Sequence, residues 1–111
     1  MISDIECSSK KGFPKAEKDP VIQIANVVTI HGQKEPFIKN VFVLDTCTDI
    51  LGVDVRCFKT EKELLKAWKE FVLEVDPDIL TGYNIVNFDI PYIFDRAKAL
   101  KVCFNFCFLK F

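Results

Sequence analysis

The stretch TEKELLKAWKEFVLEVDP, residues 60–77, carries the clearest secondary-structure signal in the sequence. Thr60 and Glu63 have the Thr-x-x-Glu spacing of a capping box, in which each side chain satisfies a backbone N–H that a helix start leaves free. Apolar residues then recur at helical spacing, with charged residues on the opposite face. Asp76-Pro77 ends the pattern, because proline cannot continue a helix. The stretch predicts an amphipathic helix, and we interpret Trp68 as a core residue rather than a stacking platform for a base.

The sequence upstream of this helix favours β-strands. Residues 21–30, VIQIANVVTI, and residues 37–44 are rich in β-branched and aromatic side chains. A glycine-containing turn separates them, which predicts a β-hairpin. Shorter strands are expected at residues 1–7 and 55–58. Residues 8–20 contain serine, lysine, glycine and proline and are expected to form a loop.

Downstream, residues 79–81 are short and apolar enough for a buried strand, and residues 82–84, Gly-Tyr-Asn, are expected to form a loop at its end. A second helix is predicted from Asp89 or a neighbouring cap to about residue 100. Pro91 suits its first turn, where a missing N–H costs nothing. This order of elements predicts an α/β fold with helices packed on a mixed sheet.

The composition allows one small globular domain. Of 111 residues, 50% are hydrophobic and 28% are charged. No apolar run is long enough for a membrane-spanning helix, and the first residues lack the basic and apolar regions of a signal peptide. We therefore expect an intracellular protein without membrane association. The five cysteines include no CxxC pair and there is one histidine, so reduced thiols are expected rather than a zinc site.

The net charge of -1 argues against a protein that holds duplex DNA by charge alone. It is compatible with a nuclease of the two-metal type, because such an enzyme approaches phosphate through cations held by its own carboxylates.

Three acidic residues are candidates for such a site. Asp4 and Glu6 lie two apart on a predicted strand, so both carboxylates point to one face and Ile5 points to the other. Paired acids of this kind also occur by chance on solvated sheet edges. Asp89 lies at the predicted start of the second helix, where a simple N-cap is the alternative interpretation.

These acids fall within motifs of a known family. Residues 4–6, Asp-Ile-Glu, resemble the first exonuclease motif of the DEDD superfamily, Asp-x-Glu. Residues 82–89, GYNIVNFD, with Pro91-Tyr92, resemble the second motif in its family B DNA polymerase form. The resemblance covers about residues 4–102. Three connecting stretches resemble the delta branch of that family more than the epsilon or zeta branches: DPVIQI at 19–24, DPDILTG at 76–82 and RAKALKV at 96–102.

The resemblance implies a ribonuclease H-like fold, incomplete at its C-terminal side. It also implies proofreading, in which the 3′-terminal phosphodiester of a mispaired primer is hydrolysed with two Mg²⁺ or Mn²⁺ ions. By the same resemblance, Asp4, Glu6 and Asp89 would be the catalytic metal ligands. Asp4 would bridge both ions, Glu6 would hold the ion that carries the attacking water, and Asp89 would support the second ion.

The resemblance further implies contacts with DNA. Asn84 and Phe88 match positions that line the single-stranded primer end, Asn84 by polar contact and Phe88 by packing. The expected partners are the single-stranded 3′ end of a DNA primer, the remainder of a polymerase chain and its accessory subunits. The expected location is the nucleus.

The sequence also departs from the family pattern. The third motif, a tyrosine with an aspartate four residues later, is not found in residues 90–111, where Tyr92 is followed at that distance by Arg96. Ser3 stands where the family usually has phenylalanine, so the first strand is expected to lack a packing group.

We therefore predict a partial exonuclease domain over residues 1–102 and an aromatic tail over residues 103–111 that departs from the family. The isolated chain is expected to be inactive or very weakly active. The alternative is a non-catalytic ribonuclease H-like module with an interaction or structural role. A DEDD nuclease acting on RNA is disfavoured, because the connecting segments match the polymerases.

Overall fold

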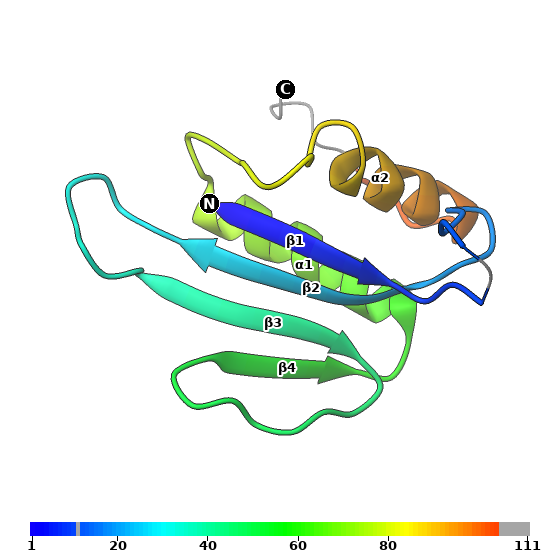
Figure 1. Ribbon diagram of the computed structural model, residues 1–111, viewed down its shortest axis with the longest axis horizontal. Coiled ribbons are helices and arrows are strands. Elements are labelled where there is room, and N and C mark those ends of the chain that lie inside the picture. The colour runs from blue at the N-terminus through cyan, green and yellow to red at the C-terminus, as the bar shows by residue number, and fades with distance from the viewer. Residues whose placement is uncertain (11, 105–111) are drawn as a thin grey trace.

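The computed structural model describes residues 1–10 and 12–104, and most of the predicted aromatic tail, residues 105–111, lies outside them. Figure 1 shows four strands and two helices within the described part of the chain. Their bounds are β1 Ile2–Cys7, β2 Val21–Val28, β3 Ile38–Leu44, β4 Asp54–Phe58, α1 Glu61–Val75 and α2 Asp89–Ala99. None of the described helices is long and apolar enough to cross a membrane.

The strands form one sheet in the order β1-β2-β3-β4. β1 pairs with β2 and β2 with β3 in antiparallel fashion, whereas β3 and β4 are parallel. The predicted α/β class with a mixed sheet is confirmed, and so is the hairpin of β2 and β3.

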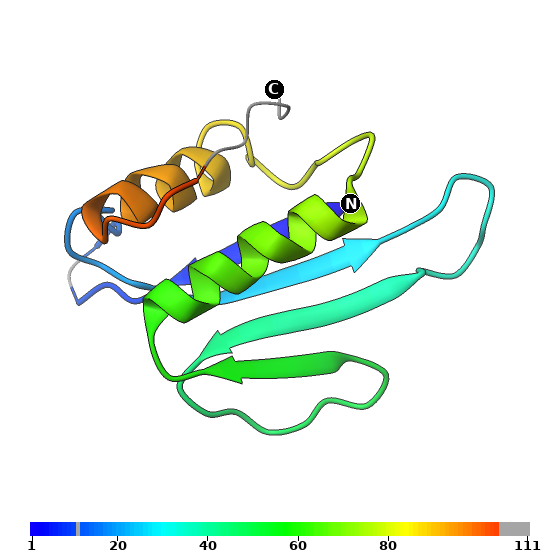
Figure 2. The ribbon, with the colours of Figure 1, turned by 180° about the vertical axis from the view of Figure 1, so that it is seen from behind.

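The fold has two layers, with α1 packed across one face of the sheet (Figure 2). The other helix, α2, lies beyond the β1 edge in both views. Phe71 of α1 meets Phe42 of β3 edge to face, with ring centroids 5.6 Å apart. The core between α1 and the sheet is formed chiefly by Ile5, Ile24, Phe42, Leu64, Leu65, Trp68, Phe71 and Val72.

The start of α1 has the predicted cap. The Thr60 hydroxyl accepts a hydrogen bond from the Glu63 N–H at 3.3 Å. At the other end, Asp76 adopts a left-handed conformation with φ of 48° and donates its N–H to the Val72 carbonyl. The helix therefore begins and ends where the sequence predicted.

A row of polar side chains crosses the buried face of the sheet beneath α1. The Asn26 carboxamide oxygen accepts from the Ser3 hydroxyl at 2.8 Å and from the Trp68 indole N–H at 3.1 Å. The Asn26 amide donates to the Asn40 oxygen at 2.9 Å. Ser3 is 2% exposed and so fills its core position with a hydrogen bond rather than with apolar bulk. The Asn40 amide nitrogen has no hydrogen-bond partner among the described residues.

One prediction about the segment after α1 is wrong. Residues 79–81 are not a buried strand, because they contribute a single bridge, between Thr81 and Ile2, and Ile79 is 71% exposed. Pro77 and Gly82 confine this segment to too few residues for a ladder. Asp89 is not the N-cap of α2. Phe88 holds that position without a side-chain hydrogen bond, and Asp89 is the first helical residue.

Candidate active site

The first strand presents its two acids on the face of the sheet opposite α1. Asp4 and Glu6 are exposed, whereas Ser3 and Ile5 between and beside them are buried. This alternation confirms the prediction that the two carboxylates share a face.

β1 is an edge strand, and its outer N–H groups are satisfied by the segment that follows α1. The Ser3 N–H donates to the Thr81 carbonyl at 3.0 Å. The next outward N–H, that of Ile5, donates to a carboxylate oxygen of Asp89 at 3.1 Å, across 84 residues of sequence. Asp89 therefore takes the position that a backbone carbonyl would take if a neighbouring strand continued.

The loop before α2 brings Asp89 to this edge. A Cβ on Gly82 would lie 2.5 Å from the Ser3 carbonyl oxygen, so only glycine allows the backbone to pass this close to β1. Asn84 adopts a left-handed conformation with φ of 54°, and its carbonyl accepts from the Phe88 N–H at 2.9 Å. Ile85 is buried beneath this turn. The backbone thus reverses within a few residues and α2 begins beside β1.

The carboxylates of Asp89 and Asp4 come together at this edge. Asp89 is 3% exposed, and burial raises the pKa of its carboxyl. The neighbouring Asp4 also raises that pKa, by its charge and by a side-chain hydrogen bond, while the Ile5 N–H lowers it. In the described part of the chain, no three Asp, Glu, His or Cys side chains are grouped closely enough to hold a metal ion. Glu6 therefore shares the face but stands apart from the close pair, and the three-ligand set stays a prediction.

An aromatic cluster adjoins the acid pair. Phe88 packs against Tyr92 of α2, with ring centroids 5.4 Å apart. On its other side it meets Phe13 edge to face at 5.5 Å. Phe13 is 77% exposed, so one face of the cluster is open to solvent. Phe13 was not among the residues predicted from the sequence. The available signal was a large aromatic side chain placed between glycine and proline in an otherwise polar loop.

Asn84 lies on the exposed side of the same loop, where its side-chain oxygen accepts from the Asn87 amide at 3.1 Å. The roles predicted for Asn84 and Phe88 remain predictions.

Cys7, at the end of β1, is a poor nucleophile in this setting. Burial raises the pKa of its thiol to about 11, although a hydrogen bond with Tyr92 acts in the opposite direction. A thiol that stays protonated at neutral pH does not supply a reactive thiolate. Cys7 is therefore not a candidate nucleophile at this edge.

Several known proteins are similar to this chain in amino-acid sequence. Residues 1–109 match the family model described as DNA polymerase family B, exonuclease domain. The DNA polymerase delta catalytic subunit of Caenorhabditis elegans is 59% identical over 100 residues, which cover 89% of this chain and 9% of that protein. The corresponding subunit of Glycine max is 57% identical over 100 residues, with the same coverage of 89% and 9%. The chain thus spans about a tenth of the length of these relatives.

A solved structure is similar as well. The family B DNA polymerase from the hyperthermophilic archaeon Pyrobaculum calidifontis superimposes with a TM-score of 0.64 at 36% sequence identity. The match covers 91% of this chain and 11% of the archaeal chain.

Proposed function

Because the chain belongs to the exonuclease domain family of the family B DNA polymerases, we propose that it forms part of the proofreading 3′→5′ exonuclease of a delta-type replicative polymerase. The proposed reaction is hydrolysis of the terminal phosphodiester at the 3′ end of a mispaired primer. The proposed setting is the nucleus, where the remainder of the polymerase chain and accessory subunits would be its partners.

The observation that carries this proposal is the meeting of Asp4 and Asp89. Two carboxylates this close repel each other unless a proton or a cation lies between them. Asp89 is nevertheless buried, and the neighbouring Asp4 raises the pKa of its carboxyl further. Such an arrangement costs stability, which is typical of functional rather than structural acids.

The donor set fits a hard divalent cation. Carboxylate oxygens suit Mg²⁺ and Mn²⁺, and we propose Asp4, Glu6 and Asp89 as the residues that hold the ions. When bound, a pair of such ions supplies an activated water and stabilises the oxygen that leaves. The Ile5 N–H fixes one oxygen of Asp89, which leaves the other available as a ligand. Glu6, exposed on the same face, is free to turn toward the pair.

The aromatic cluster fits an unpaired base. Phe13 is largely exposed and rests on Phe88, so its free ring face is available to stack on the terminal nucleotide. We propose Asn84 as a polar contact to the same strand. The family's third motif, Tyr-x-x-x-Asp, is not found in residues 90–111, so we propose that this chain by itself hydrolyses DNA only slowly.

The test is release of the terminal nucleotide from a 3′-labelled single-stranded DNA. We expect slow release that requires Mn²⁺ or Mg²⁺ and is lost in Asp4→Ala. Glu35→Ala is the matched control, because Glu35 is an exposed acid of the hairpin turn, remote from β1 and α2.

Calorimetric titration with Mn²⁺ separates this proposal from a non-catalytic module. If the folded chain binds no Mn²⁺ and the Asp4→Ala/Glu6→Ala/Asp89→Ala variant behaves like the wild type, an interaction or structural role is favoured instead. Rapid release by the wild type would show that the three acids suffice without the third motif.

A further inference from the structure

One face of α2 is turned toward the loop of residues 8–20. Phe88, Tyr92 and Arg96 follow one another at intervals of four residues, so their side chains lie in one line along the helix. Phe88 contacts Phe13, the Tyr92 hydroxyl contacts the Asp19 carbonyl, and Arg96 contacts the Ala16 carbonyl. The loop that carries Phe13 is thus held along the length of α2.

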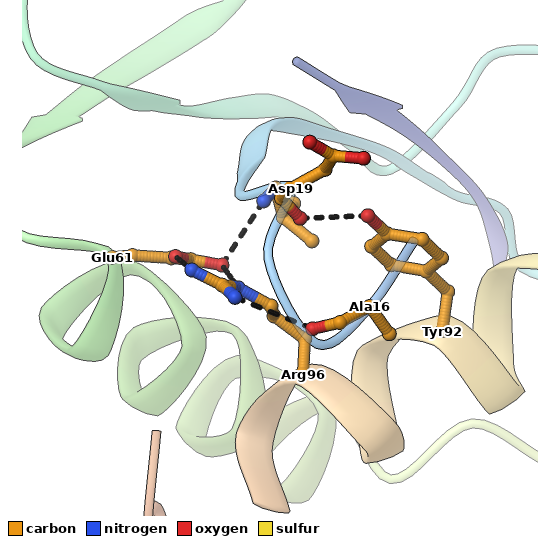
Figure 3. Close-up of polar contacts among 6 residues, drawn as sticks. Ala16, Asp19, Glu61, Tyr92 and Arg96 are labelled. Carbon is orange, nitrogen blue, oxygen red and sulfur yellow. Dashed lines mark hydrogen bonds and ion pairs between the residues drawn. The ribbon is translucent and has the colours of Figure 1, made fainter. Parts of the chain in front are cut away.

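Arg96 also forms a buried ion pair with Glu61, which joins α2 to α1 (Figure 3). Both carboxylate oxygens of Glu61 accept from Arg96 at 2.7 Å, one from Nε and one from Nη2. The Arg96 and Glu61 side chains are 11% and 9% exposed. The hydrogen bonds to Glu61 raise the pKa of Arg96 further above its usual range, so the guanidinium stays charged.

The same two side chains also hold the loop. The Glu61 carboxylate accepts from the Val21 N–H at 3.0 Å, and Arg96 Nη1 donates to the Ala16 carbonyl at 3.3 Å. One carboxylate and one guanidinium therefore hold the two ends of the segment 16–21, the end of the loop and the first residue of β2, to two different helices.

Hydrogen bonds between Lys15 and Asp19 close a turn in this part of the loop. The Asp19 side chain accepts from the Lys15 N–H at 2.8 Å, and the Asp19 N–H donates to the Lys15 carbonyl at 2.8 Å. The Tyr92 hydroxyl donates to the Asp19 carbonyl at 2.6 Å. Pro14, with its fixed φ, joins this closed turn to Phe13. The turn therefore restricts where the Phe13 side chain can lie.

We propose that the Glu61–Arg96 ion pair is a positioning device for Phe13. By fixing the 16–21 segment to α1 and α2, it sets where the Phe13 ring lies on Phe88, next to the acid pair. The consequence for DNA rests on the proposed function: Arg96 and Glu61, which touch no substrate, would decide how well the terminal base of a primer stacks.

Single and double replacements of the ion pair can distinguish a positioning role from a purely stabilising one. Removing one partner leaves an uncompensated buried charge, which is strongly destabilising. Replacing both partners by apolar residues of similar volume is often neutral for stability. A double replacement is therefore expected to keep the fold while releasing the loop.

The experiment compares four variants of the full 111-residue chain. Glu61→Leu/Arg96→Met removes the ion pair without leaving a buried charge. Arg96→Lys keeps the charge but lacks the fork needed to reach two acceptors. Phe13→Ala removes the ring itself. Arg56→Gln is the matched control, because Arg56 forms an exposed ion pair with Asp54 on β4, away from the loop.

The first measurement needs no DNA. Nuclear Overhauser contacts between the Phe13 and Phe88 rings are expected in the wild type and in Arg56→Gln. They are expected to be lost in the double variant and weakened in Arg96→Lys. The double variant should still unfold cooperatively, at a melting temperature below that of the wild type, because the buried Val21 N–H loses its Glu61 acceptor. Retention of these contacts in the folded double variant would overturn the proposal.

The second measurement uses a single-stranded oligonucleotide with 2-aminopurine at its 3′ end, whose fluorescence falls when the base stacks. Phe13→Ala is expected to weaken binding about tenfold, the effect of one stacked base. The double variant should lose the quenching to a similar degree. Normal quenching in the double variant would count against the proposal. If the wild type bound no oligonucleotide, the proposed function would fail, and the ring contacts would still decide the positioning role.

Discussion

Gly82 allows the loop after α1 to touch β1. A methyl group there would lie 2.5 Å from the Ser3 carbonyl oxygen, a backbone atom that cannot turn away. We expect Gly82→Ala to lower the free energy of unfolding by about 1–3 kcal/mol, because the two backbone segments must separate. Chemical denaturation followed by tryptophan fluorescence measures this.

Gly52→Ala is the control for that measurement. Gly52 has φ of +79° but open space around it, so its substitution reports backbone strain alone, about 1–2 kcal/mol. The position of the Asp89 carboxylate at the edge of β1 depends on the close approach of the two backbones at Gly82. Gly82→Ala should therefore weaken Mn²⁺ binding as well, whereas Gly52→Ala should not. Equal Mn²⁺ affinity in the two variants would contradict this dependence.

Local sequence rules predicted that Asp4 and Glu6 share a face, but they did not predict what the Asp89 carboxylate contacts. The alternation of a strand is a local property, so the shared face of Asp4 and Glu6 followed from their spacing alone. The role of Asp89 was not predictable in this way. Its carboxylate accepts from Ile5, and a contact across 84 residues leaves no trace in the local pattern. An acid at a helix start has the same local signature whether it caps that helix or serves a neighbouring strand.

Among the elements, α1 owes its start to one side chain. Thr60→Ala removes the acceptor for the Glu63 N–H and is expected to lower the free energy of unfolding by about 1 kcal/mol. Thr60→Ser keeps the hydroxyl and should stay close to the wild type. Urea denaturation of the three proteins measures the difference, and equal loss in both variants would show that the methyl group matters rather than the cap.

The elements with local signals were the ones predicted well. The capping box, the apolar stripe of α1 and the glycine turn of the hairpin each lie within a few residues of the structure they specify. The segment 79–81 failed because its state depends on how much free edge β1 offers, which is a property of the sheet. The local sequence pattern likewise did not predict that β3 and β4 pair in parallel.

At the scale of the whole molecule, Asp4 and Asp89 should make the stability of the fold depend on cation binding. We expect Asp4→Asn to raise the free energy of unfolding by up to about 1 kcal/mol without divalent ions, because it removes a charge beside Asp89. The wild type should gain about 1.4 kcal/mol in Mn²⁺ at ten times the dissociation constant. The variant should gain little. Thermal unfolding with and without Mn²⁺ measures both effects.

Asn87→Ala is a suitable control for these melts, because Asn87 lies on the loop before α2 but carries no charge. Its stability should respond to Mn²⁺ as the wild type does. A wild type that is indifferent to Mn²⁺, or an Asp4→Asn variant that is less stable than the wild type without ions, would contradict the linkage.

The polar row beneath α1 has a consequence for the alignment of the strands. If β1 slipped by one residue along β2, Ser3 would turn outward and the Asp4 carboxylate would enter the layer beneath α1. Asn26 would lose the Ser3 hydroxyl, and each buried polar group left unpaired costs about 1–3 kcal/mol. A wholly apolar interior would discriminate less sharply between such alignments. Three uncharged side chains, Ser3, Asn26 and Asn40, thus help to keep the acids of β1 on the outer face.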